Sequence, residues 1–117
     1  MKSMSKVLVT GASGFIGSNL TRNLIKTEDE VNVLVREKSN LWRINDVLSE
    51  CNVHTVDLSD FEEVRNLISK VKPKIVYHCA AYGVYPNQKD ISQMEQTNVT
   101  GTLNLLKALH ENSELER

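Results

Sequence analysis

The sequence predicts an α/β protein in which helices cover both faces of a parallel sheet. Short apolar runs rich in Val and Ile alternate with longer stretches whose apolar residues recur at helical spacing. Parallel strands need a crossover connection, which is usually a helix, so this alternation favours a doubly wound sheet. Right-handed crossovers restrict the topology, and we expect one domain over residues 1–117 with the strand order 3-2-1-4.

The expected elements follow from the spacing of the apolar residues. Apolar runs predict strands at residues 6–10, 31–36, 53–56 and 75–79. Helical spacing predicts helices at residues 14–26, 40–49 and 91–112, and a further helix that opens at Ser59. Ser59 and Glu62 have the spacing of a capping box, and Pro73 prevents that helix from continuing.

Three glycines follow the first predicted strand and open the first predicted helix. Gly11 would allow a tight turn, Gly14 would let phosphates approach the backbone, and Gly17 would let the helix pack closely on the sheet. The phosphates would then lie against N–H groups at the positive end of the helix. The pattern predicts a site for the pyrophosphate of a dinucleotide. The alternative is a structural turn in which the glycines only shape the backbone.

Composition and charge narrow the class of protein. The formal net charge is −1, which argues against nucleic acid as the main partner. No apolar stretch is long enough to cross a membrane. Residues 1–6 carry basic side chains without the apolar segment of a signal peptide, and Cys51 and Cys79 match no metal-binding spacing. A cytoplasmic protein with reduced thiols and no metal is therefore expected.

Four segments resemble motifs of one family. Residues 10–17, Thr-Gly-Ala-Ser-Gly-Phe-Ile-Gly, resemble the TGxxGxxG motif of the extended short-chain dehydrogenases/reductases, the NAD-dependent epimerase/dehydratase relatives. Asp57-Leu58 is similar to that family's pair beside the adenine ring, and residues 78–81 resemble its HxAA segment. Residues 97–106 resemble its NVxGTxNLL stretch. The resemblance implies a Rossmann-like fold, a nicotinamide dinucleotide cofactor and, in the full-length relative, a nucleotide-sugar or similar substrate.

The resemblance also implies which residues meet the cofactor. Tyr82, in the loop after the HxAA segment, is expected to reach the nicotinamide or the substrate. Asn98 resembles an Asn that supports the family's active site, although a polar residue on the outer face of the helix is an equal alternative. The cofactor-binding residues so predicted are Gly11, Ala12, Ser13, Gly14, Phe15, Ile16, Gly17, Arg36, Asp57, Leu58, Cys79, Ala80, Ala81 and Tyr82.

Arg36 bears on the choice between NADP and NAD. A site for NAD usually has a carboxylate at the end of the second strand, where it bonds the ribose 2′-OH. This sequence has Arg36 there, and a guanidinium binds a 2′-phosphate with charge-assisted hydrogen bonds. Ser13, Lys38 and Ser39 would add contacts, so NADP is favoured. In the alternative, Arg36 points to solvent and Glu37 turns to the ribose.

The family's catalytic pair is not found at its usual place. The family uses a Tyr-x-x-x-Lys pair after a fifth strand, and the predicted sheet is truncated before that strand. Tyr85 and Lys89 have the same spacing, but Pro86 between them disfavours the shared helical face that the pair needs. We therefore expect this chain to be inactive alone, with the loop shaping the substrate end of the cleft.

Two functional interpretations remain open beside the purely structural one. The first is the cofactor half of a nucleotide-sugar epimerase, dehydratase or reductase. The second is a stand-alone, non-catalytic dinucleotide-binding or redox-sensing module. In either case an open edge on the fourth strand and some exposure of the last helix favour a homo-oligomer. The apolar residues of that helix are Met94, Leu103, Leu106 and Leu109.

Overall fold

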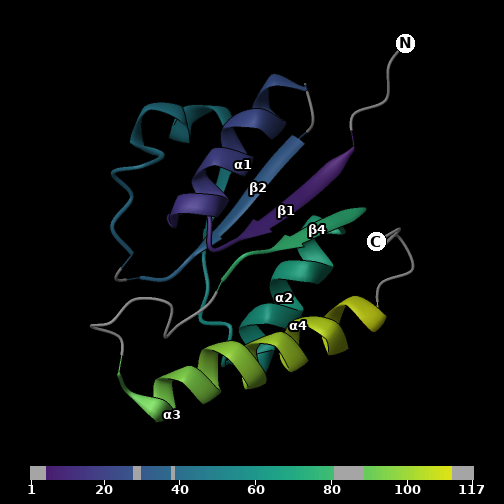
Figure 1. Ribbon diagram of the computed structural model, residues 1–117. Coiled ribbons are helices and arrows are strands. Elements are labelled where there is room, and N and C mark those ends of the chain that lie inside the picture. The colour runs from purple at the N-terminus through teal and green to yellow at the C-terminus, as the bar shows by residue number, and fades with distance from the viewer. Residues whose placement is uncertain (1–4, 28–29, 38, 81–88, 112–117) are drawn as a thin grey trace.

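A four-stranded parallel sheet organises the described part of the chain. The computed structural model describes residues 5–27, 30–37, 39–80 and 89–111 (Figure 1). The strands are β1 (Lys6–Thr10), β2 (Glu30–Val35), β3 (Asn52–Thr55) and β4 (Ile75–His78). They lie in the order β3-β2-β1-β4, and all neighbouring strands are parallel. The predicted fold class and strand order are confirmed.

Helices cover both faces of this sheet. α1 (Phe15–Lys26) lies on one face, and α2 (Phe61–Val71) and α4 (Gly101–His110) lie on the other (Figure 1). Alternate residues of a strand point to opposite faces, so each face has its own core. The core beneath α1 contains Val7, Val9, Val31, Val33 and Val35. The core beneath α2 and α4 contains Leu8, Leu34, Val64, Ile68 and Leu105.

The segment between β2 and β3 differs from the prediction. The helix expected at residues 40–49 is a 3-10 helix, η1 (Asn45–Glu50), which begins later. The Asn40 side chain accepts a hydrogen bond from the Trp42 N–H at 3.2 Å, and such local bonds compete with helix formation. Ile44 is fully buried in the core beneath α1. The residues before η1 therefore run as turns that bring them back to the sheet.

The start of α2 is also corrected. Asp60, and not Ser59, caps the helix, because its carboxylate accepts from the N–H groups of Glu62 and Glu63. The Ser59 hydroxyl instead donates to the Asp57 carboxylate at 2.7 Å. The predicted capping box between Ser59 and Glu62 is therefore wrong, because Ser59 is held in a turn by Asp57.

The last predicted helix is present, but its middle turn is unusual. It consists of α3 (Ile91–Met94), a π-helical segment η2 (Glu95–Thr100) and α4. Leu103 and Leu106 are 55% and 58% exposed, whereas Leu109 is buried. The predicted exposure of part of this helix is confirmed, and self-association stays a prediction. Among the described helices, none is long and apolar enough to span a membrane.

Candidate functional site

The glycine turn after β1 is packed too tightly for side chains at two positions. Gly11 has a φ of +68°, and a Cβ there would lie 2.6 Å from the backbone nitrogen of Ala80. A Cβ at Gly17 would lie 2.1 Å from the Gly11 carbonyl oxygen. The absence of a Cβ at Gly17 thus lets α1 pack closely against the glycine turn, whereas the sequence predicted close packing of this helix against the sheet. A Cβ at Gly14 would lie 3.4 Å from the same oxygen, which is ordinary contact.

The N-terminus of α1 meets this turn without a side-chain cap. Gly14 is the N-cap residue, with an extended backbone, and no described side chain caps the helix. No acidic residue lies in the first turn of α1. The first N–H groups of a helix carry partial positive charge and have no partner within the helix. This end of α1 is therefore suited to an anion such as a pyrophosphate.

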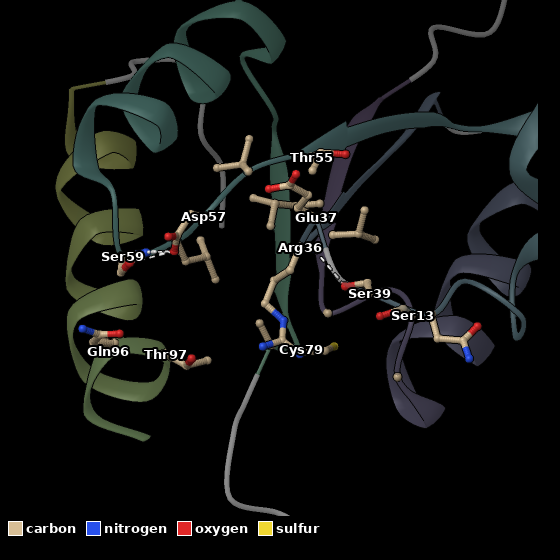
Figure 2. A pocket seen from close by; sticks show the side chains of 18 of the residues that line it. Ser13, Arg36, Glu37, Ser39, Thr55, Asp57, Ser59, Cys79, Gln96 and Thr97 are labelled. Carbon is tan, nitrogen blue, oxygen red and sulfur yellow. Dashed lines mark hydrogen bonds between the residues drawn. The ribbon is translucent and has the colours of Figure 1, made fainter. Parts of the chain in front are cut away.

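A cavity of about 700 Å³ lies at the carboxyl ends of the strands (Figure 2). Its walls come from the glycine turn, from the segments that follow β2, β3 and β4, and from α3 and η2. The volume is in the range of about 300–1,000 Å³ that is typical of small-molecule sites. The structure brings these predicted site residues together in its lining: Gly11, Ser13, Gly14, Arg36, Asp57, Leu58, Cys79 and Ala80.

The other predicted site residues that the structure describes do not line this cavity. Ala12 and Gly17 are buried beneath the turn. Phe15 and Ile16 lie at the start of α1 with side chains that are 64% and 70% exposed. These two residues therefore contribute only their backbone groups to the N-terminal end of the helix. Asn98 is exposed in η2, and its supporting role stays a prediction. Ala81, Tyr82 and Tyr85 lie outside the described residues, and Lys89 is exposed just before α3.

Arg36 and Glu37 leave the end of β2 in different directions. Figure 2 shows the Arg36 side chain extending into the cavity and the Glu37 carboxylate turned toward Thr55. Both residues belong to the cavity lining. The backbone N–H of Arg36 donates to the Ser39 hydroxyl at 2.9 Å, which fixes the turn after β2. Within the described residues the Arg36 guanidinium has no hydrogen bond or ion pair, so it is available to a ligand.

Arg43 is a cavity residue that the sequence analysis did not find. Its guanidinium donates to the Ser13 carbonyl at 3.3 Å and lies 4.7 Å from the ring centroid of Trp42. Arg22 of α1 donates to the Arg43 carbonyl and forms an ion pair with Asp46 at 2.6 Å. These contacts hold the segment after β2 against the glycine turn. The sequence carries no local signal for this contact, because Arg43 and Ser13 are 30 residues apart and meet only when this segment folds back.

Two titratable side chains lie at the carboxyl end of β4, His78 as its last residue and Cys79 directly after it. Burial raises the pKa of the Cys79 thiol, which favours its neutral form. Burial lowers the pKa of His78, which favours the neutral imidazole. His78 Nδ1 lies 2.6 Å from the Thr10 hydroxyl, and its Nε2 lies 2.8 Å from the Thr102 hydroxyl. Each ring nitrogen of His78 therefore has a hydroxyl partner.

Comparison with known sequences identifies similar nucleotide-sugar enzymes. UDP-glucose 4-epimerase of Mycoplasma pneumoniae is 36% identical over 112 residues, which cover 92% of this chain and 32% of that enzyme. The dTDP-D-glucose 4,6-dehydratase of Dictyostelium discoideum is 34% identical over 111 residues, which cover 89% of this chain and 26% of that enzyme. The chain thus spans about a third of the length of the relatives it matches.

Solved structures show the same likeness. UDP-glucose 4-epimerase of Thermus thermophilus, in complex with NAD, has a TM-score of 0.80 at 32% identity, covering 94% of this chain and 36% of that one. The UDP-Glc/GlcNAc 4-epimerase of Campylobacter jejuni has a TM-score of 0.82 at 29% identity, covering 94% and 35%. A sequence model of one family matches residues 7–117. Because this match covers nearly the whole chain, the protein belongs to the NAD dependent epimerase/dehydratase family.

Proposed function

We propose that this chain binds a nicotinamide dinucleotide as the cofactor half of a nucleotide-sugar epimerase, dehydratase or reductase. The observation that carries the proposal is the end of α1, which has no side-chain cap and meets a cavity of about 700 Å³ at the carboxyl ends of the strands. Doubly wound sheets bind dinucleotides in this crevice, with the pyrophosphate on the helix end. The relatives named above act on nucleotide sugars, which supports that substrate class for the longer protein.

The described residues supply binding and orientation. The N–H groups at the start of α1 would hold the pyrophosphate, and the absence of a Cβ at Gly14 would let it approach. Asp57 and Leu58 would line the adenine end, while Cys79 and Ala80 would line the nicotinamide end. The bound cofactor would supply hydride transfer at its nicotinamide ring. The acid/base pair for the complete reaction would come from a longer chain.

The second part of the proposal is a preference for NADP over NAD. The Arg36 side chain extends into the cavity, and its guanidinium has no hydrogen-bonding partner among the described residues. Arg43 lines the same cavity and donates to the Ser13 carbonyl. Two guanidinium groups suit a phosphate with two negative charges better than they suit a ribose 2′-OH. Ser39 also lines the cavity and lies next to Arg36. The lining therefore favours the 2′-phosphate of NADP.

The test is calorimetric titration of the folded protein with NADP+ and with NAD+. Arg36→Ala should weaken NADP+ binding by about ten- to a hundredfold, since hydrogen bonds to charged groups contribute about 1.5–3 kcal/mol. NAD+ binding should change little, because NAD+ lacks the 2′-phosphate. Arg65→Ala is the matched control, as Arg65 is an exposed arginine of α2 that does not line the cavity.

Each contrary result has a separate meaning. Equal losses for both dinucleotides in Arg36→Ala would reject the 2′-phosphate contact while keeping dinucleotide binding. Circular dichroism establishes folding before each titration. If a folded protein bound neither dinucleotide, the glycine turn would be a structural feature only, and the proposed function would be wrong.

A further inference from the structure

Three hydroxyl and imidazole groups form a hydrogen-bonded relay behind the cavity wall. The relay joins Thr10 of β1 to His78 of β4 at 2.6 Å and His78 to Thr102 of α4 at 2.8 Å. The Thr10 hydroxyl also accepts the backbone N–H groups of Cys79 at 3.0 Å and Ala80 at 3.1 Å. One hydroxyl thus links the imidazole of His78 to the backbone that immediately follows it.

Hydrogen-bond accounting fixes the protonation of this relay. A hydroxyl oxygen has two acceptor sites and one proton to donate. The N–H groups of Cys79 and Ala80 both donate to the Thr10 hydroxyl, and the Cys79 N–H is shared with the Thr10 backbone carbonyl at 3.2 Å. With both of these bonds in place, the hydroxyl proton goes to His78 Nδ1. Nδ1 therefore carries no proton, and the ring proton lies on Nε2, which donates to the Thr102 hydroxyl. Only the neutral Nε2–H form of His78 satisfies every bond.

The relay holds the part of the wall on which the glycine turn packs. Cys79 and Ala80 line the cavity together with Gly11. A Cβ at Gly11 would lie 2.7 Å from the Cys79 carbonyl carbon and 2.8 Å from the Ala80 Cα, so the two backbones are in direct contact. A shift of the Cys79 and Ala80 backbone would therefore move the turn or open a gap beside it.

The helix at the far end of the relay also holds the opposite wall. Thr102 lies in the first turn of α4, next to Gly101, where a Cβ would lie 3.0 Å from the Leu58 Cβ. Asn104 donates from its amide to the Leu58 carbonyl at 2.9 Å. Leu58 lines the cavity after β3, whereas Cys79 lines it after β4. Polar contacts from one turn of α4 thus set the position of both walls.

From this geometry we propose that His78 is a positioning residue of the dinucleotide site, which must be neutral and protonated on Nε2 for tight binding. The inference rests on the proposed dinucleotide function. A proton added at Nδ1 would face the Thr10 oxygen, which accepts it only by releasing the Ala80 N–H or by leaving the Cys79 N–H to the Thr10 backbone carbonyl alone. Protonation of His78 therefore loosens the wall on which Gly11 packs, and dinucleotide affinity falls.

The described surroundings of His78 contain no charge that stabilises the imidazolium. Burial alone lowers its pKa, with no charged neighbour contributing. Its partner on β1 is Thr10 and its partner on α4 is Thr102, both uncharged. On α4 the titratable side chains are Lys107, which lies over the Phe61 ring, and the exposed His110. On β4 and directly after it they are Tyr77, which packs in the core beneath α1, and the neutral thiol of Cys79.

The first arm of the test determines the tautomer without any cofactor. Long-range 1H–15N correlation spectra of the histidine rings, recorded at about pH 7.5, report which ring nitrogen carries the proton. We expect His78 to show an unprotonated Nδ1 and a protonated Nε2. A proton on Nδ1, or a doubly protonated ring at this pH, would overturn the inference whether or not the protein binds a dinucleotide.

The second arm measures NAD+ affinity at about pH 7.5 and about pH 5. NAD+ is the probe because the 2′-phosphate of NADP+ itself titrates at about pH 6, as other phosphomonoesters do. The wild-type protein should bind more weakly at the lower pH. His78→Gln, whose amide can still donate to Thr102 but does not titrate, should bind with little pH dependence. His110→Gln is the matched control and should keep the wild-type pH dependence.

Thr102 provides a variant outside the cavity lining. Thr102→Val keeps the shape but removes the acceptor for Nε2–H, so NAD+ affinity at about pH 7.5 should fall about two- to tenfold, as for the loss of one hydrogen bond of about 0.5–1.5 kcal/mol. Thr102→Ser keeps the hydroxyl and should bind like the wild type. Wild-type affinity in Thr102→Val, or unchanged pH dependence in His78→Gln, would reject the positioning role while leaving dinucleotide binding intact. Absence of binding by the folded wild type would instead reject the proposed function itself.

Discussion

The two ends of the sheet both carry hollows, but their polar groups are arranged differently. At the carboxyl end the cavity of about 700 Å³ is lined by Arg36 and by the uncapped start of α1. At the amino end a hollow of about 540 Å³ is lined by Lys6, Glu30, Asn32, Asn52 and His54, among others. The hydrogen bonds at the two ends, and not the volumes of the hollows, distinguish the candidate binding site from the structural feature.

Three polar side chains at the amino end, Asn32, Asn52 and His54, bond one another. Asn32, which is 3% exposed, accepts from Asn52 at 3.3 Å and bonds His54 Nε2 at 3.0 Å. Its amide donates to the Val7 carbonyl at 3.3 Å. These bonds fasten β3, an edge strand, to β2 and β1. At the carboxyl end, by contrast, the Arg36 guanidinium has no partner among the described residues. Buried polar groups that are already paired offer little to a ligand, whereas donors without partners invite one.

The largest expected effect separates stability from binding within the glycine turn itself. Gly17→Ala would place a Cβ 2.1 Å from the Gly11 carbonyl oxygen, so backbone must move and stability should fall by about 1–3 kcal/mol, as in overpacked cores. Gly14→Ala meets only ordinary contact at 3.4 Å and has a φ of −80°, so stability should change little. Its methyl group lies at the cavity, however, and dinucleotide affinity should fall by more than about tenfold. Urea unfolding and calorimetric titration measure the two effects.

The contrast between the two glycines is the control. If Gly14→Ala lost as much stability as Gly17→Ala, Gly14 would have a structural role that the contacts do not show. If Gly14→Ala bound dinucleotide like the wild type, the pyrophosphate would lie elsewhere in the cavity. Either result would break the distinction between the packed and the open part of the turn.

The sequence predicts the sheet and the turn because their signals are local. The apolar runs and the glycine spacing predict β1, α1 and the turn between them. Because the strands are parallel, Asp57 and Cys79 then lie at the same end of the sheet as Gly11. The cap of α2 was predicted at Ser59 but lies at Asp60, because Asp57 competes for the Ser59 hydroxyl. Such competition between neighbouring polar side chains is not visible in a spacing rule.

The remaining site residues depend on tertiary contacts. Arg43 reaches the cavity because Arg22 and Ile44 draw its segment onto α1 and the core, while the helix predicted at residues 40–49 would have placed it differently. The tautomer of His78 follows from bonds to two other elements, β1 and α4. A sequence motif identified His78 and Thr102 separately, but only the fold shows that they touch.

A smaller effect is expected at the amino end. Asn32→Ala removes three hydrogen bonds and leaves the Val7 carbonyl without this donor, so stability should fall by about 1 kcal/mol. Dinucleotide affinity should stay at the wild-type value, because Asn32 lies at the other end of the sheet. Urea unfolding with titration of the same sample tests both statements. A loss of affinity in folded Asn32→Ala would show that the two ends of the sheet are coupled.

The smallest expected effect is a pH dependence of stability that both ends share. Burial lowers the pKa of His78 at the carboxyl end, and burial together with Lys70 lowers that of His54 at the amino end, from the ordinary value of 6.5. As pH falls below about 6.5, the unfolded chain takes up protons before the folded one, so stability falls and then levels off once the folded histidines are protonated. This pH window lies well above the ordinary pKa of 3.8 of Asp46, whose hydrogen bond and ion pair with Arg22 lower that pKa further.

Urea unfolding at about pH 8 and about pH 5.5 should show the loss of stability, and His54→Gln and His78→Gln should each remove part of this loss. Stability that does not change between these two pH values would mean that the fold holds neither histidine in its neutral form, which contradicts the protonation assigned to His78 in the relay.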